Sequence, residues 1–261
     1  MANAFEVTQM DHPFYHIGFL EKQEARYAIL PGDPGRVEKI AAYLEDAHFL
    51  CSNREFTTYC GRLDGVPVLV TSTGIGGPSA AIAVEELYQS GVRTFLRVGT
   101  CGGMQAQVCG GDLVIANAAI RMEGTSKEYA PVEYPAVSDF TVTSALEKAA
   151  RQSGQTYHIG VVQSKDSFYG QHAPERMPVG AQLQANWDAW IRCGALASEM
   201  ETAAVFTVAG TLRARAGCVL YTLWNQEREK AGFPNIQGND TDSAIRTAVR
   251  AFRIMIQQDK G

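Results

Sequence analysis

The chain has 261 residues, a hydrophobic fraction of 46%, a charged fraction of 20% and a formal net charge of −5. These values are typical of an ordinary globular protein, and the acidic balance without a basic stripe argues against a nucleic-acid-binding protein. No apolar run approaches the roughly 20 residues that a membrane span requires.

The N-terminal segment and the cysteines bear on location. Residues 1–12 have neither the basic start nor the apolar core of a secretion signal. The six cysteines are scattered without a C-x-x-C pair, which favours reduced thiols over a disulfide framework. We therefore expect a cytoplasmic protein. Because no linker, repeat or low-complexity tract divides the chain, we expect one domain over residues 1–261.

Apolar residues recur every two residues in some segments and every 3.6 residues in others, and these periods predict strands and helices in turn along the chain. The second and third strands flank Asp64-Gly65, a two-residue hairpin signal. Strands are predicted at 27–30, 56–63, 66–73, 94–98, 112–119, 159–163 and 218–223, and helices at 37–44, 79–89, 144–152, 199–212 and 242–257.

Strands separated by helices predict an α/β fold with a mixed, largely parallel central sheet flanked by helices. In such sheets, ligands bind beyond the carboxyl ends of the strands. The stretch 164–184 is rich in Pro, Gly and Gln, so we expect it to form a mobile flap.

Three glycine-rich segments follow predicted strands. They read P-G-D-P-G-R at 31–36, T-G-I-G-G-P-S at 73–79 and G-T-C-G-G-M at 99–104. None is a Walker-type phosphate loop or a dinucleotide fingerprint, and each alone is equally consistent with an ordinary tight turn. Three such turns in one chain favour close backbone approach to a ligand.

Arginines beside these turns are candidate anion ligands, because the planar guanidinium suits phosphate oxygens. Arg97 interrupts an apolar strand, and a buried guanidinium needs a partner. Arg36 lies in the first turn of a predicted helix, where the helix N-terminus also favours an anion. For Arg36 and Arg54, a surface salt bridge is the alternative interpretation.

Two further positions carry possible chemistry. The acids in Glu199-Met200-Glu201 could simply stabilise a helix start, or one of them could accept both hydroxyls of a sugar diol while Met200 packs against the sugar. His16 precedes the first strand without the partners that a metal site needs, so no metal site of that kind is predicted.

Taken together, these residues resemble the nucleoside phosphorylase family and, within it, the branch that acts on uridine. The similarity covers nearly the whole chain from about His16. The matching strings are P-G-D-P-G-R, N-R-E-F-T-T, S-T-G-I-G-G-P-S-A-A-I-A-V-E-E-L, R-T-F-L-R-V-G-T, K-D-S-F-Y and E-M-E-T.

The resemblance implies a pentosyltransferase that converts uridine, and its deoxy analogue, with phosphate into uracil and the sugar 1-phosphate. It implies no organic cofactor. It also implies a hexamer, a trimer of dimers with shared sites, in which Arg54 and His16 reach a neighbour's site. By resemblance, phosphate is bound by Gly32, Arg36, Arg54, Arg97 and Thr100, the ribose by His16, Met200 and Glu201, and a monovalent cation such as K⁺ near Glu55, Ile75 and Ser79 at the dimer interface.

The loop that would contact the base departs from the family pattern. The common string F-Y-P-G-Q-E-R is replaced by F-Y-G-Q-H-A-P-E-R, so Arg176 has moved five positions beyond Gln171 and its role stays open. Phe168 is expected to wall the base, and Gln171 to bind the amide edge of uracil.

The altered loop raises the question of what neutralises the departing uracil anion. We hypothesise that Lys165 and His172 do so and act with Arg97 as the catalytic residues, since a histidine can donate a proton near neutral pH. The alternative is a solvent-exposed pair on a flexible loop. Purine-cleaving relatives carry an acid just after the 218–223 strand, whereas this chain reads T-L-W-N-Q at 222–226, which favours uridine.

Other activities remain open on the sequence alone. A purine nucleoside phosphorylase or a nucleosidase of the same fold is the main alternative, although a nucleosidase would not need three arginines for phosphate. A non-catalytic nucleoside-binding protein on this scaffold is a second alternative. A nicotinamide oxidoreductase is the weakest, because the dinucleotide fingerprint is missing.

Overall fold

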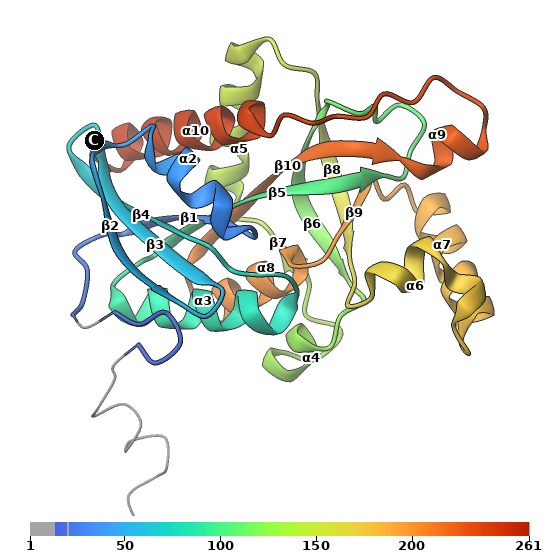
Figure 1. Ribbon diagram of the computed structural model, residues 1–261, viewed down its shortest axis with the longest axis horizontal. Coiled ribbons are helices and arrows are strands. Elements are labelled where there is room, and N and C mark those ends of the chain that lie inside the picture. The colour runs from blue at the N-terminus through green and yellow to red at the C-terminus, as the bar shows by residue number, and fades with distance from the viewer. Residues whose placement is uncertain (1–13, 20, 261) are drawn as a thin grey trace, which may run out of the picture.

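The computed structural model describes residues 14–19 and 21–260 (Figure 1). The expectation about a secretion signal concerns residues 1–12, which lie outside these ranges. Within the described ranges, no helix is both long and apolar enough to span a membrane.

The secondary structure alternates between strands and helices as expected. The strands are β1 Tyr27–Pro31, β2 Glu45–Asn53, β3 Phe56–Leu63, β4 Val66–Thr71, β5 Thr94–Gly103, β6 Leu113–Arg121, β7 Ala136–Val137, β8 Tyr157–Ser164, β9 Ala197–Glu199 and β10 Arg215–Asn225. The helices are α2 Val37–Ala41, α3 Gly77–Ser90, α4 Thr125–Tyr129, α5 Phe140–Ser153, α6 Phe168–His172, α7 Gly180–Arg192, α8 Thr202–Thr211, α9 Gln226–Lys230 and α10 Asp242–Lys260, with 3₁₀ turns at Pro34–Arg36 and Pro174–Arg176.

The strands form one mixed sheet, ordered β10-β6-β8-β9-β5-β1-β4-β3-β2 in the described part of the chain. An additional pairing of β10 with β5 closes the strands β5, β9, β8, β6 and β10 into a ring. β1 runs parallel to both β4 and β5, and β10 runs parallel to β5. At one edge of the sheet, β3 pairs antiparallel with both β2 and β4. The predicted α/β fold is confirmed.

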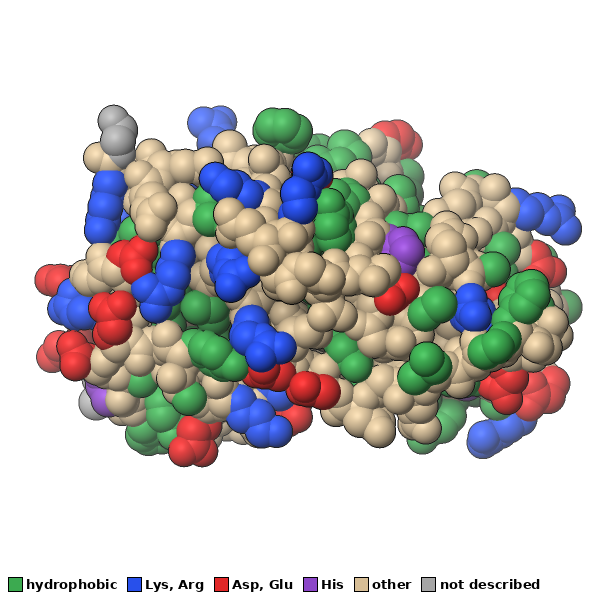
Figure 2. Space-filling view, turned by 90° about the horizontal axis from the view of Figure 1, so that it is seen from above, with side chains coloured by type: hydrophobic (Ala, Val, Ile, Leu, Met, Phe, Trp, Pro, Cys, Tyr) green, Lys and Arg blue, Asp and Glu red, His purple; other side chains and the backbone are tan. Residues whose placement is uncertain are grey.

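Helices cover both faces of the sheet, with α2, α5 and α10 on one side and α3, α4 and α8 on the other (Figure 1). The strand period of two explains both layers. In β1, Tyr27 and Ile29 join the core beneath α5 and α10, while Ala28 and Leu30 join the core beneath α3 and α8. Seen from the side of α10, basic and acidic side chains are interspersed (Figure 2), as the composition suggested.

Turn and capping chemistry explain where two of the elements begin or end. The hairpin of β3 and β4 turns at Asp64 and Gly65, which both adopt positive φ angles of 50° and 76°, as a two-residue turn requires. Asp139 caps α5 by accepting hydrogen bonds from the backbone N–H groups of Thr141 and Val142. The turn therefore lies where it was predicted, whereas α5 begins at Phe140, before the predicted start at 144.

The glycine-rich segment after residue 98 does not form the expected turn, because β5 continues to Gly103 and stays paired with β10. Glycine is required there for a different reason. A β-carbon on Gly99 would lie 2.7 Å from Nη2 of Arg97, and one on Gly103 would lie 2.6 Å from Nδ2 of Asn225. Neighbouring side chains thus cross the strand where the glycines leave room.

Two other expectations need correction. The stretch 164–184 contains α6, a 3₁₀ turn and the start of α7, because Ser167 caps α6 by accepting from the Gly170 N–H. The helix predicted from 199 begins only at Thr202, since residues up to Glu199 form β9 in the sheet. The strand β2 is absent from the prediction because most of its residues are exposed and show no alternation.

Candidate active site

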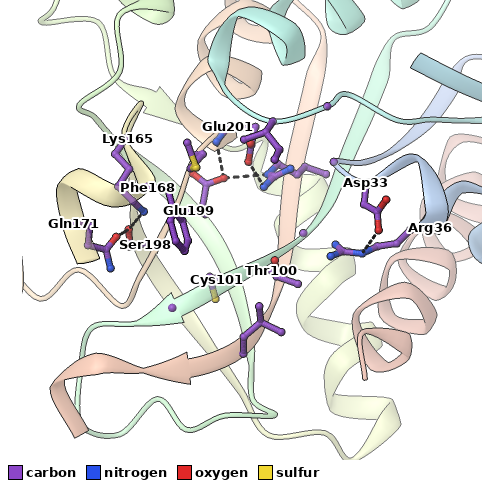
Figure 3. Close-up of a pocket in the computed structure, with 18 of the residues that line it drawn as sticks. Asp33, Arg36, Thr100, Cys101, Lys165, Phe168, Gln171, Ser198, Glu199 and Glu201 are labelled. Carbon is purple, nitrogen blue, oxygen red and sulfur yellow. Dashed lines mark hydrogen bonds and ion pairs between the residues drawn. The ribbon is translucent and has the colours of Figure 1, made fainter. Parts of the chain in front are cut away.

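A cavity of about 760 Å³ opens at the carboxyl ends of β1, β4, β5, β8 and β9, where the fold predicts a ligand site (Figure 3). Arg36 lies at one end, Gln171 and Phe168 lie at the other, and Glu201 lies between them. The cavity is lined by the predicted residues Gly32, Arg36, Glu55, Ile75, Arg97, Thr100, Lys165, Phe168, Gln171, His172, Met200 and Glu201.

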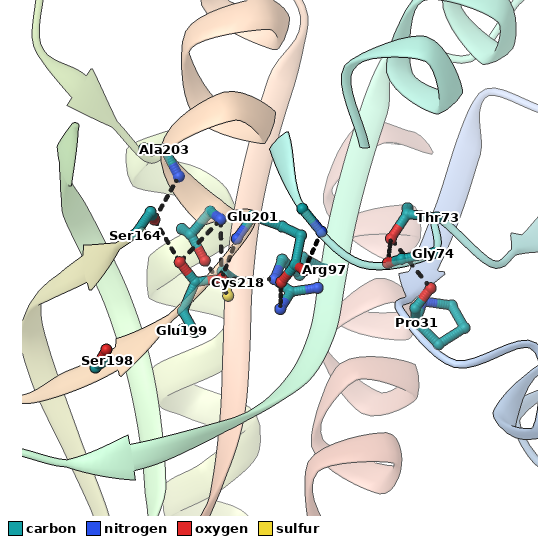
Figure 4. Close-up of polar contacts among 12 residues, drawn as sticks. Pro31, Thr73, Gly74, Arg97, Ser164, Ser198, Glu199, Glu201, Ala203 and Cys218 are labelled. Atoms are coloured by element: carbon teal, nitrogen blue, oxygen red, sulfur yellow. Dashed lines mark hydrogen bonds and ion pairs between the residues drawn. The ribbon is translucent and has the colours of Figure 1, made fainter. Parts of the chain in front are cut away.

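Arg97 is the buried centre of the site, with 4% of its surface exposed. Its Nε donates to Oε2 of Glu199 at 3.1 Å, and its Nη2 donates to Oε2 of Glu201 at 2.5 Å (Figure 4). The Nη1 atom is buried and has no hydrogen-bond partner among the described residues. Because an unpaired buried donor is costly, this atom is suited to an anion entering the cavity.

Burial and charge act in opposite directions on these three groups. Burial alone lowers the pKa of Arg97, but the carboxylates of Glu201 and Glu199 outweigh it and raise that pKa above its ordinary value. Burial raises the pKa of Glu199, yet Arg97 and several hydrogen bonds bring it below its ordinary value. Burial leaves the pKa of Glu201 raised, with Arg97 offsetting part of the shift.

The two carboxylates have different structural partners. Glu199 accepts from the backbone N–H groups of Glu201 and Thr202 and from the Ser164 hydroxyl, so it caps α8 as well as holding Arg97. Both carboxylates line the cavity, but within the described part of the chain Glu201 accepts hydrogen bonds only from the Arg97 side chain and from the Gly76 N–H, the latter at 2.6 Å. Glu201 therefore has fewer protein partners than Glu199 and keeps more of its accepting capacity for a molecule in the cavity.

The end of the cavity near Nη1 of Arg97, which we call the anion end, combines a second arginine with glycine backbone. A β-carbon built on Gly32 would lie 4.0 Å from Nη1 of Arg97, so the backbone there leaves space beside that donor. Arg36 lines the same end, and burial lowers its pKa. Its Nε lies 3.8 Å from Oδ2 of Asp33, which is a weak pair that leaves the guanidinium available to the cavity. Thr100 completes this end.

The opposite end is aromatic on one side and polar on the other. The rings of Phe168 and His172 have centroids 4.4 Å apart, and the Trp224 ring lies 6.5 Å from His172. Burial, followed by the charge of Lys165, lowers the pKa of His172. These rings are tilted relative to one another, and together with the polar Gln171 they suit a planar heteroaromatic group. Arg176 lies outside the lining of the cavity.

Lys165 is not the exposed loop residue of the alternative interpretation, since only 8% of its surface is exposed. Its Nζ donates to Oγ of Ser198 at 2.5 Å. Burial lowers the pKa of Lys165 to about 8, although Glu199 and Glu201 oppose the shift. Its ammonium can therefore lose a proton near physiological pH.

His16 and Arg54 lie outside the lining of the cavity and on a shared surface. Nδ1 of His16 lies 2.6 Å from Oε1 of Glu86, and Asn53 donates to the His16 carbonyl at 2.9 Å. Arg54 is exposed, has a φ of 53° and lies over the ring of Tyr15 at 5.6 Å. In one chain, these two residues are not brought to the site.

Near this surface, the residues expected around a cation lie close together. Oγ of Ser79 donates to Oε1 of Glu55 at 2.6 Å, and this hydrogen bond is the main cause that lowers the pKa of Glu55. Ile75 is 78% exposed, and Ser79 itself lies outside the cavity lining.

Some lining residues were missed by sequence reasoning. Ser198 belongs to a string that suggested a helix start. Trp224 gave no signal because it lies near the end of β10, whose apolar residues indicate only a buried strand. Cys101 also lines the cavity, but burial raises the pKa of its thiol to about 12, so it is a poor nucleophile. Asn225 stands near where an acid would serve purine cleavage, and its side chain donates to the carbonyls of Gln105 and Val108.

Comparison with known proteins agrees with this geometry. A model of the phosphorylase superfamily matches residues 26–257. The chain is 55% identical over 245 residues to the uridine phosphorylase of Treponema pallidum (strain Nichols), covering 94% of this chain and 95% of that protein. It is 41% identical over 247 residues to the uridine phosphorylase of Escherichia coli (strain K12), covering 93% and 98%. It is 45% identical over 192 residues to the guanosine phosphorylase of Halorubrum lacusprofundi, covering 74% and 75%.

Proposed function

Because the chain belongs to the phosphorylase superfamily, we propose that it is a pentosyltransferase that catalyses the reversible phosphorolysis of uridine to uracil and ribose 1-phosphate. The observation that carries this proposal is the unpaired, buried Nη1 of Arg97, which lies in a cavity with Glu201 at its middle and Gln171 at its far end. Phosphate, sugar and base each have a matching chemical partner in that order.

The reaction needs phosphate beneath the sugar carbon that bears the base. Arg97, Arg36, Thr100 and the Gly32 backbone would hold phosphate there, since guanidinium groups bind its oxygens in pairs. The Glu201 carboxylate would accept hydrogen bonds from the 2′- and 3′-hydroxyls, and Met200 would pack against the sugar. As the glycosidic bond lengthens, positive charge develops on the ribose and negative charge on the base. Fixed position and electrostatics then supply most of the acceleration.

Lys165 and His172 would stabilise the departing uracil, with Phe168 as a wall and Gln171 on the amide edge. The distances support Lys165 as a group held by Ser198 at the base end of the cavity. His172 would contact the departing uracil from the aromatic side of the cavity. Because its pKa is lowered, its ring is mostly neutral at pH 7 and can donate one hydrogen bond.

Replacing Lys165 with methionine should lower kcat/KM for uridine by about tenfold or more, because a charge-assisted hydrogen bond to the leaving base is lost. In the unaltered enzyme, kcat/KM should fall as pH rises through about 8, since the pKa of Lys165 lies there and only the ammonium form stabilises an anion. The pH profile of kcat/KM for uridine measures both effects. The K165M profile should lack that alkaline decline.

The matched control is Lys148→Met, which alters an exposed lysine on α5 and should leave the profile unchanged. Values of kcat/KM within threefold of the unaltered enzyme for both K165M and His172→Ala would contradict the assignment of these two residues to the leaving group.

The substrate and the nucleophile are tested by one assay. We expect base release from uridine and deoxyuridine only when phosphate is present, because Arg97 and Arg36 would then have their anion. Release without phosphate would instead indicate a nucleosidase. Guanosine, inosine and adenosine are included because one relative is a guanosine phosphorylase. Asn225 offers no acid for purine cleavage, so we expect uridine to be preferred.

We further propose a hexamer built as a trimer of dimers. In support, His16 and Arg54 share a surface away from this chain's own cavity, as expected of residues that serve a neighbouring subunit. The same surface continues to Glu55 and Ser79, near which a monovalent cation such as K⁺ would sit. Sedimentation showing a monomer under assay conditions, or activity indifferent to K⁺, would contradict these two proposals.

We place the enzyme in the cytoplasm. The scattered cysteines without a C-x-x-C pair support this location. Cell fractionation that recovers the protein outside the cytoplasm would contradict it.

A further inference from the structure

Ser198 lies at the centre of a polar network, of which the mechanism above uses only the hydrogen bond between Ser198 and Lys165. It belongs to β9, where it pairs with Gly102 of β5 on one side and with Gln163 of β8 on the other. Only 3% of its surface is exposed, yet it lines the cavity. Its hydroxyl is therefore held in the sheet immediately beside the base end.

Three side chains converge on this hydroxyl. Nζ of Lys165 donates to Oγ at 2.5 Å. Oε1 of Gln163 lies 2.5 Å from Oγ, and Oε1 of Gln171 lies 2.8 Å from it. A serine hydroxyl has one proton to donate, so it can satisfy only one of the two glutamine oxygens at a time.

The two glutamines differ in their freedom. Gln163 is 3% exposed within β8, and its Nε2 lies 3.2 Å from Sδ of Met122. Gln171 is on the short helix α6 and lines the cavity. When Ser198 donates to Oε1 of Gln171, the Nε2 group of Gln171 is left to donate to a carbonyl of the base. When Ser198 donates to Gln163, the Gln171 amide must turn to avoid facing oxygen with oxygen.

We propose that Ser198 is a positioning residue that fixes the amide orientation of Gln171 and thereby selects bases with a carbonyl rather than an amino group at the recognised edge. This inference rests on the proposed function, in which Gln171 binds the base. The orientation with Nε2 toward the cavity donates to a uracil carbonyl, and Oε1 keeps a second lone pair for N3–H. The turned orientation matches the amino group and N3 of cytosine instead.

The charge of Lys165 controls this choice. A charged ammonium can only donate, so it fills an acceptor position on Oγ and leaves the hydroxyl proton for a glutamine. A neutral amine can accept that proton, and Gln171 then loses its donor. The groups facing Lys165 are Glu199 from the end of β9, Glu201 immediately before α8, Cys101 from β5 and His172 from α6. The lowered pKa of Lys165, about 8, places the change within an accessible pH range.

The test compares Ser198→Ala and Ser198→Cys with the unaltered enzyme, using uridine and cytidine at saturating phosphate. Cysteine has nearly the same shape as serine but donates weakly, so the two variants should show the same change in substrate preference, and S198C serves if S198A folds poorly. The ratio of kcat/KM for uridine to that for cytidine should fall by about tenfold, the order of one lost hydrogen bond. The KM for phosphate should stay unchanged, because the anion end does not contact Ser198.

Two further measurements separate positioning from general damage. The KM for uridine should rise with pH above about 8 in the unaltered enzyme and should not respond to pH in S198A. Ser90→Ala is the control, because Ser90 is an equally buried serine whose hydroxyl donates to the Leu87 carbonyl within α3. It should leave the uridine-to-cytidine ratio unchanged.

The outcomes are distinct. An unchanged uridine-to-cytidine ratio in S198C, or an equal rise of KM for uridine and phosphate, overturns the positioning role. If the unaltered enzyme releases no uracil in the presence of phosphate, the proposed function itself has failed, and that result is visible before any variant is measured.

Discussion

Replacing Arg97 with methionine should reduce kcat/KM for phosphorolysis on the order of 10³-fold, because the site loses the main donor for its anion. The same change should lower the free energy of unfolding by about 3–5 kcal/mol, since Glu199 and Glu201 remain as buried carboxylates without their cation. Steady-state kinetics with varied phosphate and denaturant unfolding measure the two effects separately.

Two companion variants decide whether both effects have this origin. Adding Glu199→Gln and Glu201→Gln to R97M removes the uncompensated charges, so stability should recover in part while activity stays low. Arg215→Met is the matched control, because Arg215 pairs with Asp259 at a half-exposed site and should cost about 1 kcal/mol without loss of activity. Wild-type phosphate KM in R97M would contradict the assignment of Arg97.

The second large effect is expected from Glu201→Gln. A neutral amide weakens the hydrogen bonds to the sugar hydroxyls, so kcat/KM for uridine should fall about 100-fold. Deoxyuridine has no 2′-hydroxyl, so only one hydrogen bond to residue 201 is weakened. Its kcat/KM should therefore fall about tenfold less than that for uridine. The ratio of the two substrates at saturating phosphate is the measurement. Equal losses for both would show that Glu201 does not bind the 2′-hydroxyl.

Glu147→Gln provides the control for this substitution. Glu147 pairs with Arg151 four residues later on the outer face of α5, away from the cavity. The E147Q substitution should leave kcat/KM for uridine and deoxyuridine, and the ratio of the two, unchanged, because exposed ion pairs of this kind contribute little to stability.

The fold was predictable wherever burial followed a regular period. The hairpin of β3 and β4 could be located from its alternation and from Asp64-Gly65, and α10 from its apolar stripe. The strand β2 could not, because its side chains are mostly exposed and it exists only through pairing with β3. The extension of β5 through Gly103 could not be predicted either, because glycine is required there by the side chains of Arg97 on the same strand and Asn225 on β10.

The site divides in the same way. Arg97 was recognisable because a charged residue in an apolar strand needs a compensating partner. Ser198 was not, because its importance depends on Lys165 and Gln171, which are 33 and 27 residues away in sequence. The sequence also gave no sign that Lys165 is buried, since a lysine beside Asp166 and Ser167 ordinarily belongs to an exposed loop.

The ring of strands also bears on how substrate choice could change in this fold. Arg97 and Glu199 lie on strands of the ring, so the anion end is fixed by many pairings at once. The helix α6, which carries Phe168, Gln171 and His172, is inserted between β8 and β9 without being a member of the ring. Under the proposed function, in which α6 contacts the base, an insertion or deletion in that connection would alter base preference and leave the strands that carry Arg97 and Glu199 unchanged. The string F-Y-G-Q-H-A-P-E-R, which departs from the common F-Y-P-G-Q-E-R, lies in that connection.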